Sequence, residues 1–149
     1  MICCSSTKII WISPISIAAK FRCAVSTCCP PSCDGYWFLG VRWAEKAVDE
    51  LGISADIIDL RSLVPLDYES ITASVKRTNK VLILHEDTLF GGIGGEIAAW
   101  ISEHLFEFLD APVLRAASLD TPVPFAIPLE QNFFPIEQLK TQLNKLLNY

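Results

Sequence analysis

An uninterrupted apolar run, Val81-Leu82-Ile83-Leu84, constrains the fold of this chain more than any other feature. Successive side chains of a strand point to opposite faces of the sheet, so a strand without polar positions is buried on both faces. Burial of both faces is typical of parallel sheets, whose crossover helices cover them. The run therefore predicts an inner strand of a parallel sheet that lies between two layers of helices.

The segments around this run alternate between helical and extended patterns from residue 41 onward. Helices are predicted where apolar residues recur at helical spacing, and strands where short apolar runs end at turn residues. The predicted helices span 41–52, 67–78, 96–109 and 135–149, and the predicted strands span 53–60, 80–86 and 112–118. A proline-rich connector is predicted over 119–135. This alternation indicates an α/β fold with a mostly parallel sheet.

Length and composition limit the class of protein further. A chain of 149 residues is long enough for one domain with its own core. Its content of 51% hydrophobic and 19% charged residues is typical of a globular protein. The net charge of −5 argues against a nucleic-acid partner. No apolar run reaches the roughly 18 residues that a membrane span needs, so no membrane partner is expected.

Residues 1–38 differ in character from the rest of the chain. They contain all of the cysteines, which are Cys3, Cys4, Cys23, Cys28, Cys29 and Cys33. This spacing lacks two separate Cys-x-x-Cys pairs, which argues against zinc, and the cysteine-free remainder does not resemble a disulfide-stapled fold. Lys8 precedes an apolar stretch of signal-peptide length, but Pro14 interrupts that stretch. We favour a fourth interpretation, in which residues 1–38 are a non-native or disordered start and residues 39–149 form the domain.

The segment HEDTLFGGIGGEIAAWI, residues 85–101, places four glycines before a predicted helix. Glycines at a helix start often bind phosphate, but no Gly-Lys-Ser/Thr follows here and the spacing is not Gly-x-Gly-x-x-Gly. Glu96 in the first helical turn would repel a phosphate. We therefore expect Gly91, Gly92 and Gly94 to form a tight turn that packs closely on the sheet or on a neighbouring subunit.

Candidate catalytic groups are few. His85, Glu86 and Asp87 are a potential acid–base cluster at a strand end. The second histidine, His104, falls within a predicted helix, and no Gly-x-Ser-x-Gly segment indicates a nucleophile. No catalytic, cofactor-binding or metal-binding residue is therefore predicted.

Five linked segments, DLRSLVPLD, VLILHED, GGIGGEIAAWI, FLDAPVLR and LDTPVPFA, carry a family resemblance over about residues 39–149. They resemble the C-terminal domain of the beta subunit of thiamine-dependent 2-oxo acid dehydrogenases, which is related to the transketolase C-terminal domain. The resemblance implies a three-layer α/β/α domain with a mostly parallel, five-stranded sheet. It also implies that thiamine diphosphate, Mg and the catalytic bases belong to parts of the complete enzyme that this chain lacks, so that the chain alone binds no cofactor.

The same resemblance implies which residues contact other proteins. An acidic residue at Asp110 and the terminal carboxylate at Tyr149 are expected to dock the dihydrolipoyl acyltransferase core. The alpha subunit and a second beta subunit are further expected partners. The residues expected at subunit interfaces or in structural motifs are Arg61, His85, Glu86, Asp87, Gly91, Gly92, Gly94, Glu96, Asp120, Pro122 and Pro124.

The resemblance leaves the substrate and the start of the domain open. The stretch Asp120 to Pro124 and the ending Asn148-Tyr149 favour the branched-chain, 2-oxoisovalerate type over the pyruvate type. A stand-alone small-anion-binding module and a deoxyxylulose phosphate synthase-like domain are rival interpretations. The match breaks at about Leu39, where the aromatic stretch 36–41 is expected to replace the family's first strand. The expected location is the bacterial cytoplasm, or the mitochondrial matrix in a eukaryote.

Overall fold

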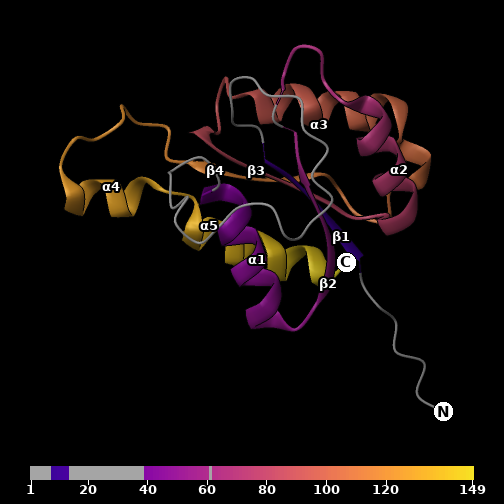
Figure 1. Cartoon of the computed structure of the whole chain (residues 1–149), viewed down its shortest axis with the longest axis horizontal. Coiled ribbons are helices and arrows are strands. Elements are labelled where there is room, and N and C mark those ends of the chain that lie inside the picture. Colours follow the sequence, from indigo (N-terminus) through magenta and orange to yellow (C-terminus); the bar gives the residue numbers. More distant parts are fainter. Residues whose placement is uncertain (1–7, 14–38, 61) are drawn as a thin grey trace, which may run out of the picture.

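The computed structural model describes residues 8–13, 39–60 and 62–149. These form three layers, with a parallel sheet between two layers of helices (Figure 1). The strands are β1 (Lys8–Ser13), β2 (Ser54–Asp59), β3 (Val81–Thr88) and β4 (Leu114–Ser118), in the order β2-β1-β3-β4. The helices are α1 (Leu39–Leu51), α2 (Tyr68–Thr78), α3 (Ile93–His104), α4 (Ile127–Phe133) and α5 (Ile136–Leu147), with a short 3₁₀ helix, η2, over Phe106–Phe108. The predicted α/β class is confirmed.

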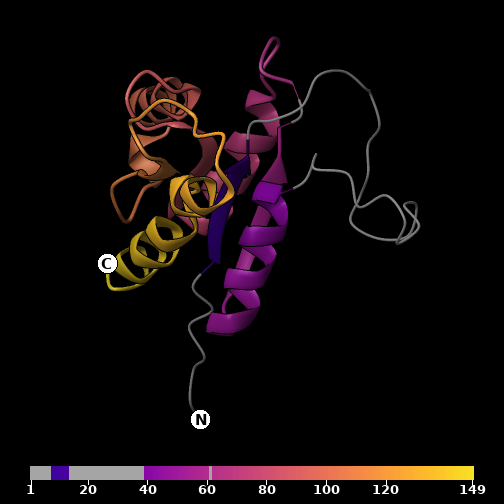
Figure 2. The same cartoon turned by 90° about the vertical axis from the view of Figure 1, so that its left-hand side faces the viewer.

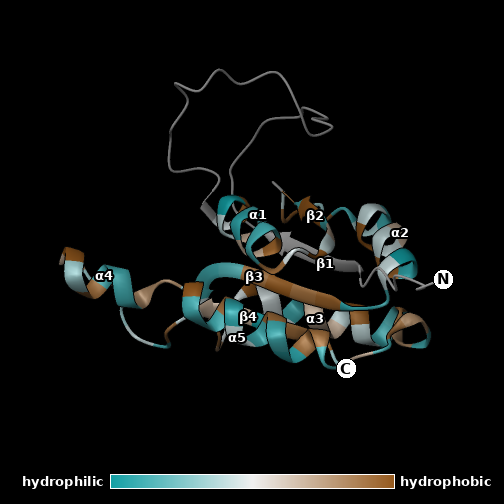
Figure 3. Cartoon of the chain, turned by 90° about the horizontal axis from the view of Figure 1, so that it is seen from below, coloured by the Kyte–Doolittle hydropathy of each residue, from teal (hydrophilic) through white to brown (hydrophobic). Residues whose placement is uncertain are grey.

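Strand β3 lies inside the sheet and is covered on both faces. Its residues alternate between two cores, with Leu82 and Leu84 packing against α1 and α5. Val81 and Ile83 pack against α2 and α3 on the opposite face. All four side chains are at most 1% exposed, and Figure 3 shows β3 passing from the hydrophobic to the hydrophilic colour. The apolar run therefore has the doubly buried position that its sequence predicts.

The other strand of the sheet's centre, β1, comes from the cysteine-rich segment. Backbone pairing joins β1 to β2 over six residues and to β3 from Ile10 to Ile12. The domain boundary near residue 38 stays a prediction. The expected first strand over 36–41 is wrong for residues 39–41, because these form the first turn of α1. The six cysteines and residues 36–38 lie outside the described residues.

The described residues contain four strands, so the expected fifth strand is not confirmed. They also contain a helix, α4, inside the predicted connector. Pro128 falls in the first turn of α4, where a missing backbone N–H removes no helical hydrogen bond. The predicted connector over 119–135 therefore contains a helix that the sequence pattern did not predict. Figures 1 and 3 show α4 projecting away from the three layers, and in Figure 2 this side of the molecule faces the viewer.

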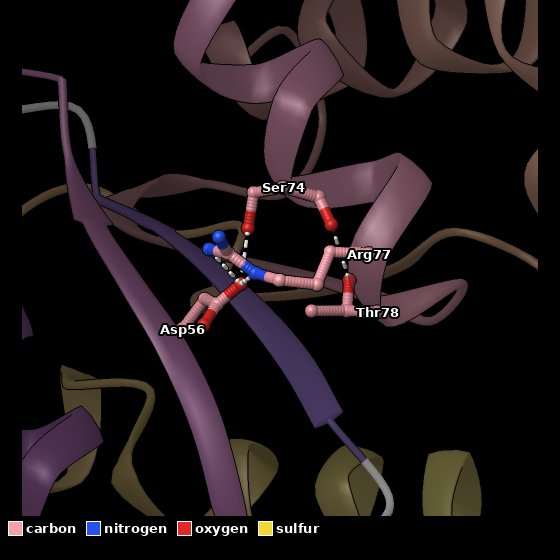
Figure 4. A network of polar contacts seen from close by, with 4 residues as sticks. All are labelled: Asp56, Ser74, Arg77 and Thr78. Atoms are coloured by element: carbon pink, nitrogen blue, oxygen red, sulfur yellow. Dashed lines mark hydrogen bonds and ion pairs between the residues drawn. The ribbon is translucent and has the colours of Figure 1, made fainter.

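A polar network fixes the outer strand β2 to α2 (Figure 4). The Ser74 hydroxyl and the Arg77 Nε–H each donate a hydrogen bond of 2.8 Å to Oδ2 of Asp56. The Thr78 hydroxyl donates to the Ser74 carbonyl at 2.9 Å. At the start of α2, Asp67 accepts a hydrogen bond from the Ser70 N–H at 3.0 Å and thereby caps the helix.

Candidate functional site

The glycine turn after β3 closes over the side chain of His85. The ring is 2% exposed and lies against the turn between β3 and α3. A Cβ atom at Gly92 would lie 2.7 Å from Cε1 of His85, and one at Gly94 would lie 2.5 Å from Cδ2 of the same ring. Gly91 has a φ of +75°, a conformation that residues with a side chain rarely adopt. The glycines therefore make room for the imidazole ring, which packs where their side chains would otherwise lie.

The buried ring of His85 is electrostatically unusual. Neither ring nitrogen has a hydrogen-bond partner among the residues that the structure describes. Burial lowers the pKa of His85, and the Arg115 charge lowers it further, whereas Asp87 acts in the opposite direction. The neighbouring Glu86 has its pKa raised by burial. Burial therefore favours the neutral form of His85, and the ring has no hydrogen bond to Glu86 or Asp87, its partners in the potential acid–base cluster.

Two side chains from β4 and its C-terminal extension hold the turn in place. Arg115 donates from Nη1 to the Leu89 carbonyl oxygen at 3.1 Å. Asp120 accepts a hydrogen bond from the Phe90 N–H at 2.9 Å through Oδ1. The expectation that Asp120 belongs to a structural motif is consistent with this contact. Arg115 was missed by sequence reasoning, although a lone arginine within an apolar strand is a signal that its charge has a specific partner.

A groove of about 700 Å³ runs between α3, η2 and the segment leading into β4. Its walls include Asp110 and Tyr149, the two residues expected to dock a partner. The backbone N–H of Asp110 donates to the Asn79 carbonyl at 2.8 Å, which fixes its position at the end of α2. The remaining lining is Gly95, Ala98, Ala99, Ser102, Phe106, Leu109, Ala111, Pro112, Val113 and Arg115. The fold thus places the charged side chains of Asp110 and Arg115 at a shallow surface of mostly small and apolar side chains.

The projecting segment 119–129 exposes a series of large apolar side chains. Those exposed by 60% or more are Val123, Phe125, Ile127 and Leu129. They lie in the same segment as the predicted interface residues Pro122 and Pro124. Exposed apolar surface of this kind marks contact sites with other proteins.

The remaining expectations have simple outcomes. Glu96 is exposed in the first turn of α3, and Arg61 lies outside the described residues. In the ranges that the structure describes, no group of three or more His, Cys, Asp or Glu side chains is arranged to hold a metal. Within the same ranges, the helices are too short or too polar to cross a membrane.

The fold and these surfaces define a three-layer α/β domain whose prominent features are a groove and an exposed apolar arm. The chain belongs to the transketolase C-terminal domain family, whose model matches residues 39–138.

Relatives with established names share this domain. The chain is 49% identical over 92 residues to the 2-oxoisovalerate dehydrogenase subunit beta of Pseudomonas aeruginosa, covering 62% of this chain and 26% of the relative. It is 47% identical over 88 residues to the pyruvate dehydrogenase E1 component subunit beta of Staurastrum punctulatum, covering 59% and 27%. The mitochondrial pyruvate dehydrogenase E1 component subunit beta of Dictyostelium discoideum is 43% identical over 109 residues, covering 68% and 31%. The chain thus spans roughly a quarter to a third of these relatives.

A solved structure supports the fold. A split gene transketolase, described as an inactive beta4 tetramer, superposes with a TM-score of 0.63 over 96% of this chain and 39% of that chain. The sequence identity is 20%, so this likeness concerns the fold alone.

Proposed function

We propose that this chain is the C-terminal assembly and docking domain of the beta chain of a 2-oxo acid dehydrogenase. The observation that carries the proposal is the groove that has both Asp110 and Tyr149 on its walls. The names of the relatives support the same enzyme class. In the complete enzyme, a 2-oxo acid is oxidatively decarboxylated and the acyl group is transferred to lipoamide.

The described residues do not fit thiamine diphosphate or Mg. The glycine turn is filled by the His85 ring, and Glu96 adds negative charge at the start of α3. No cluster of metal-ligating side chains exists in the described ranges. The proposal therefore assigns cofactor binding and catalysis to other parts of the enzyme.

The isolated chain is expected to release no CO₂ from 2-oxoisovalerate or pyruvate above the background rate, even with thiamine diphosphate and Mg²⁺ added. The physical reason is that the described residues contain no group of side chains arranged to hold the metal of the cofactor. Release of labelled CO₂ from a 1-¹⁴C substrate measures this, with a complete dehydrogenase as the positive control. Turnover by the isolated chain would contradict the proposal.

Asp110 supplies the negative charge of the docking groove. Asp110 is exposed, and basic side chains of a small acyltransferase domain would form charge-assisted hydrogen bonds with its carboxylate. Apolar contact with Phe106 and Leu109 would add to the affinity.

Replacing Asp110 with asparagine is expected to weaken binding of the peripheral subunit-binding domain of the dihydrolipoyl acyltransferase about tenfold, the loss of roughly one charge-assisted contact. Isothermal titration calorimetry at two salt concentrations measures this, because the lost contact is electrostatic. Glu107→Gln removes a nearby negative charge outside the groove lining and serves as the control. Equal affinity of the wild type and the Asp110→Asn variant would refute the assigned surface.

The exposed arm around Phe125 is proposed to contact the alpha subunit or the second beta subunit. Its large apolar side chains suit a subunit interface, which buries such groups in its core. Its prolines restrict the loop before binding, which reduces the conformational entropy lost on assembly.

Within this proposal, the branched-chain type is preferred to the pyruvate type because of the stretch Asp120 to Pro124. Relatives of both types match the chain, so substrate comparison in the assembled enzyme is the deciding measurement. The proposed location is the bacterial cytoplasm or the mitochondrial matrix, and one relative's name includes the word mitochondrial.

A further inference from the structure

The docking groove carries opposite charges at two different places along its length. Arg115 lies beside the start of α3, where its Nη1 would be 3.3 Å from a Cβ on Gly95. Asp110 lies before β4 and is fixed to Asn79 at the end of α2. Along α3 the lining runs from Gly95 to Ser102, and the seven helical steps between these residues span about 10 Å.

The surface between the two charges is apolar and shallow. Ala98, Ala99 and Ser102 line it from α3, and these small side chains let another backbone approach closely. Leu109, Ala111 and Val113 complete it from the segment that leads into β4. An element about two helical turns long fits such a surface when its own contacting side is apolar.

We propose that the partner face seated in this groove presents an acidic group to Arg115 as well as a basic group to Asp110, with an apolar stretch between them. This inference rests on the proposed docking function and names the chemistry of the partner. One ion pair allows a partner to bind in many orientations. Opposite charges at two points fix its direction, because a reversed partner would place like charges together.

Arg115 is able to bind an acid while it holds the glycine turn. Its bond to the Leu89 carbonyl uses one of the five N–H donors of the guanidinium group, so further donors stay available for a carboxylate. The side chain is partly buried, and charge pairs in such places are less screened by salt than pairs at the rim.

The test measures binding of the full chain to the peripheral subunit-binding domain of the dihydrolipoyl acyltransferase from the same organism, by calorimetry. Arg115→Gln is expected to lower the affinity about tenfold, and Arg115→Lys is expected to restore most of it. Each acidic residue of the acyltransferase domain is also replaced in turn by its amide. One of these variants should bind the wild-type chain more weakly but should cause no additional loss of affinity for the Arg115→Gln chain. Circular dichroism confirms that every variant is folded.

Asp120→Ala is the matched control, because it removes the other anchor of the glycine turn and Asp120 does not line the groove. It should bind like the wild type. Equal losses in Asp120→Ala and Arg115→Gln would overturn the inference, because loosening of the turn would then explain both. Unchanged affinity of Arg115→Gln with weakened binding of Asp110→Asn would overturn the inference and leave the docking function standing. No binding to the wild type would overturn both.

Discussion

Replacing Gly94 with alanine should lower the free energy of unfolding by about 3 kcal/mol, the upper part of the range for overpacked cores. The added Cβ would lie 2.5 Å from Cδ2 of His85, inside the van der Waals contact distance. The His85 ring is 2% exposed and β3 is buried on both faces. The ring and the strand are therefore unable to move away from the added methyl group without disturbing the core. Urea unfolding followed by circular dichroism measures the effect as a shift of the midpoint.

Two further variants separate the clash from other costs of losing a glycine. Gly91→Ala meets no atom within 4 Å, so it should cost only the backbone strain of a φ of +75°, about 1–2 kcal/mol. Combining Gly94→Ala with His85→Ala should recover much of the loss, because the second change removes the atoms that the new methyl group meets. Strictly additive effects of Gly94→Ala and His85→Ala would show that the two positions are not in contact.

The sequence predicted the doubly buried strand at 81–84 because burial of consecutive apolar residues is a local pattern. It also predicted that the glycines form a tight turn, since glycine permits the backbone conformations that such turns require. It did not predict that His85 fills the turn. That contact depends on how β3 and α3 meet in space, and nothing in the spacing of residues 85–94 specifies it.

The same distinction explains the other differences. The role of Asp67 as a helix cap is a contact between residues three apart, so it was predictable. The contacts of Arg115 and Asp120 join residues 26 and 30 positions apart, and such contacts follow from strand order. Strand β1 was missed because its surroundings in sequence, rich in cysteine, outweighed the apolar pattern of KIIWIS. The groove was half anticipated, because the resemblance indicated Asp110 and Tyr149 but not the apolar surface beside them.

Acidification from pH 8 to pH 5 should destabilise the wild type through His85 by up to about 1.4 kcal/mol per pH unit below pH 6.5. The pKa of His85 is below its usual 6.5 in the folded state, because burial disfavours the charged ring. Between the folded-state pKa and 6.5, the unfolded chain therefore binds more protons than the folded chain. Stability is lost as the pH falls through this window and is unaffected above it.

Burial of Glu86 acts on stability in the opposite direction, so the wild-type curve alone does not isolate His85. The pKa of Glu86 is raised by burial, so the folded state favours the neutral carboxyl and gains stability as the pH falls towards 4.5.

The deciding quantity is the difference between the unfolding free energies of the wild type and His85→Ala at each pH. We expect this difference to be constant above about pH 7 and to change in favour of the variant below pH 6.5. The capping carboxylate Asp67, whose pKa is lowered by its hydrogen bonds to Ser70, stays ionised throughout and cancels in the comparison. Parallel curves from pH 5 to pH 8 would mean that His85 is protonated as easily in the fold as in water, which its unpartnered nitrogens and 2% exposure argue against.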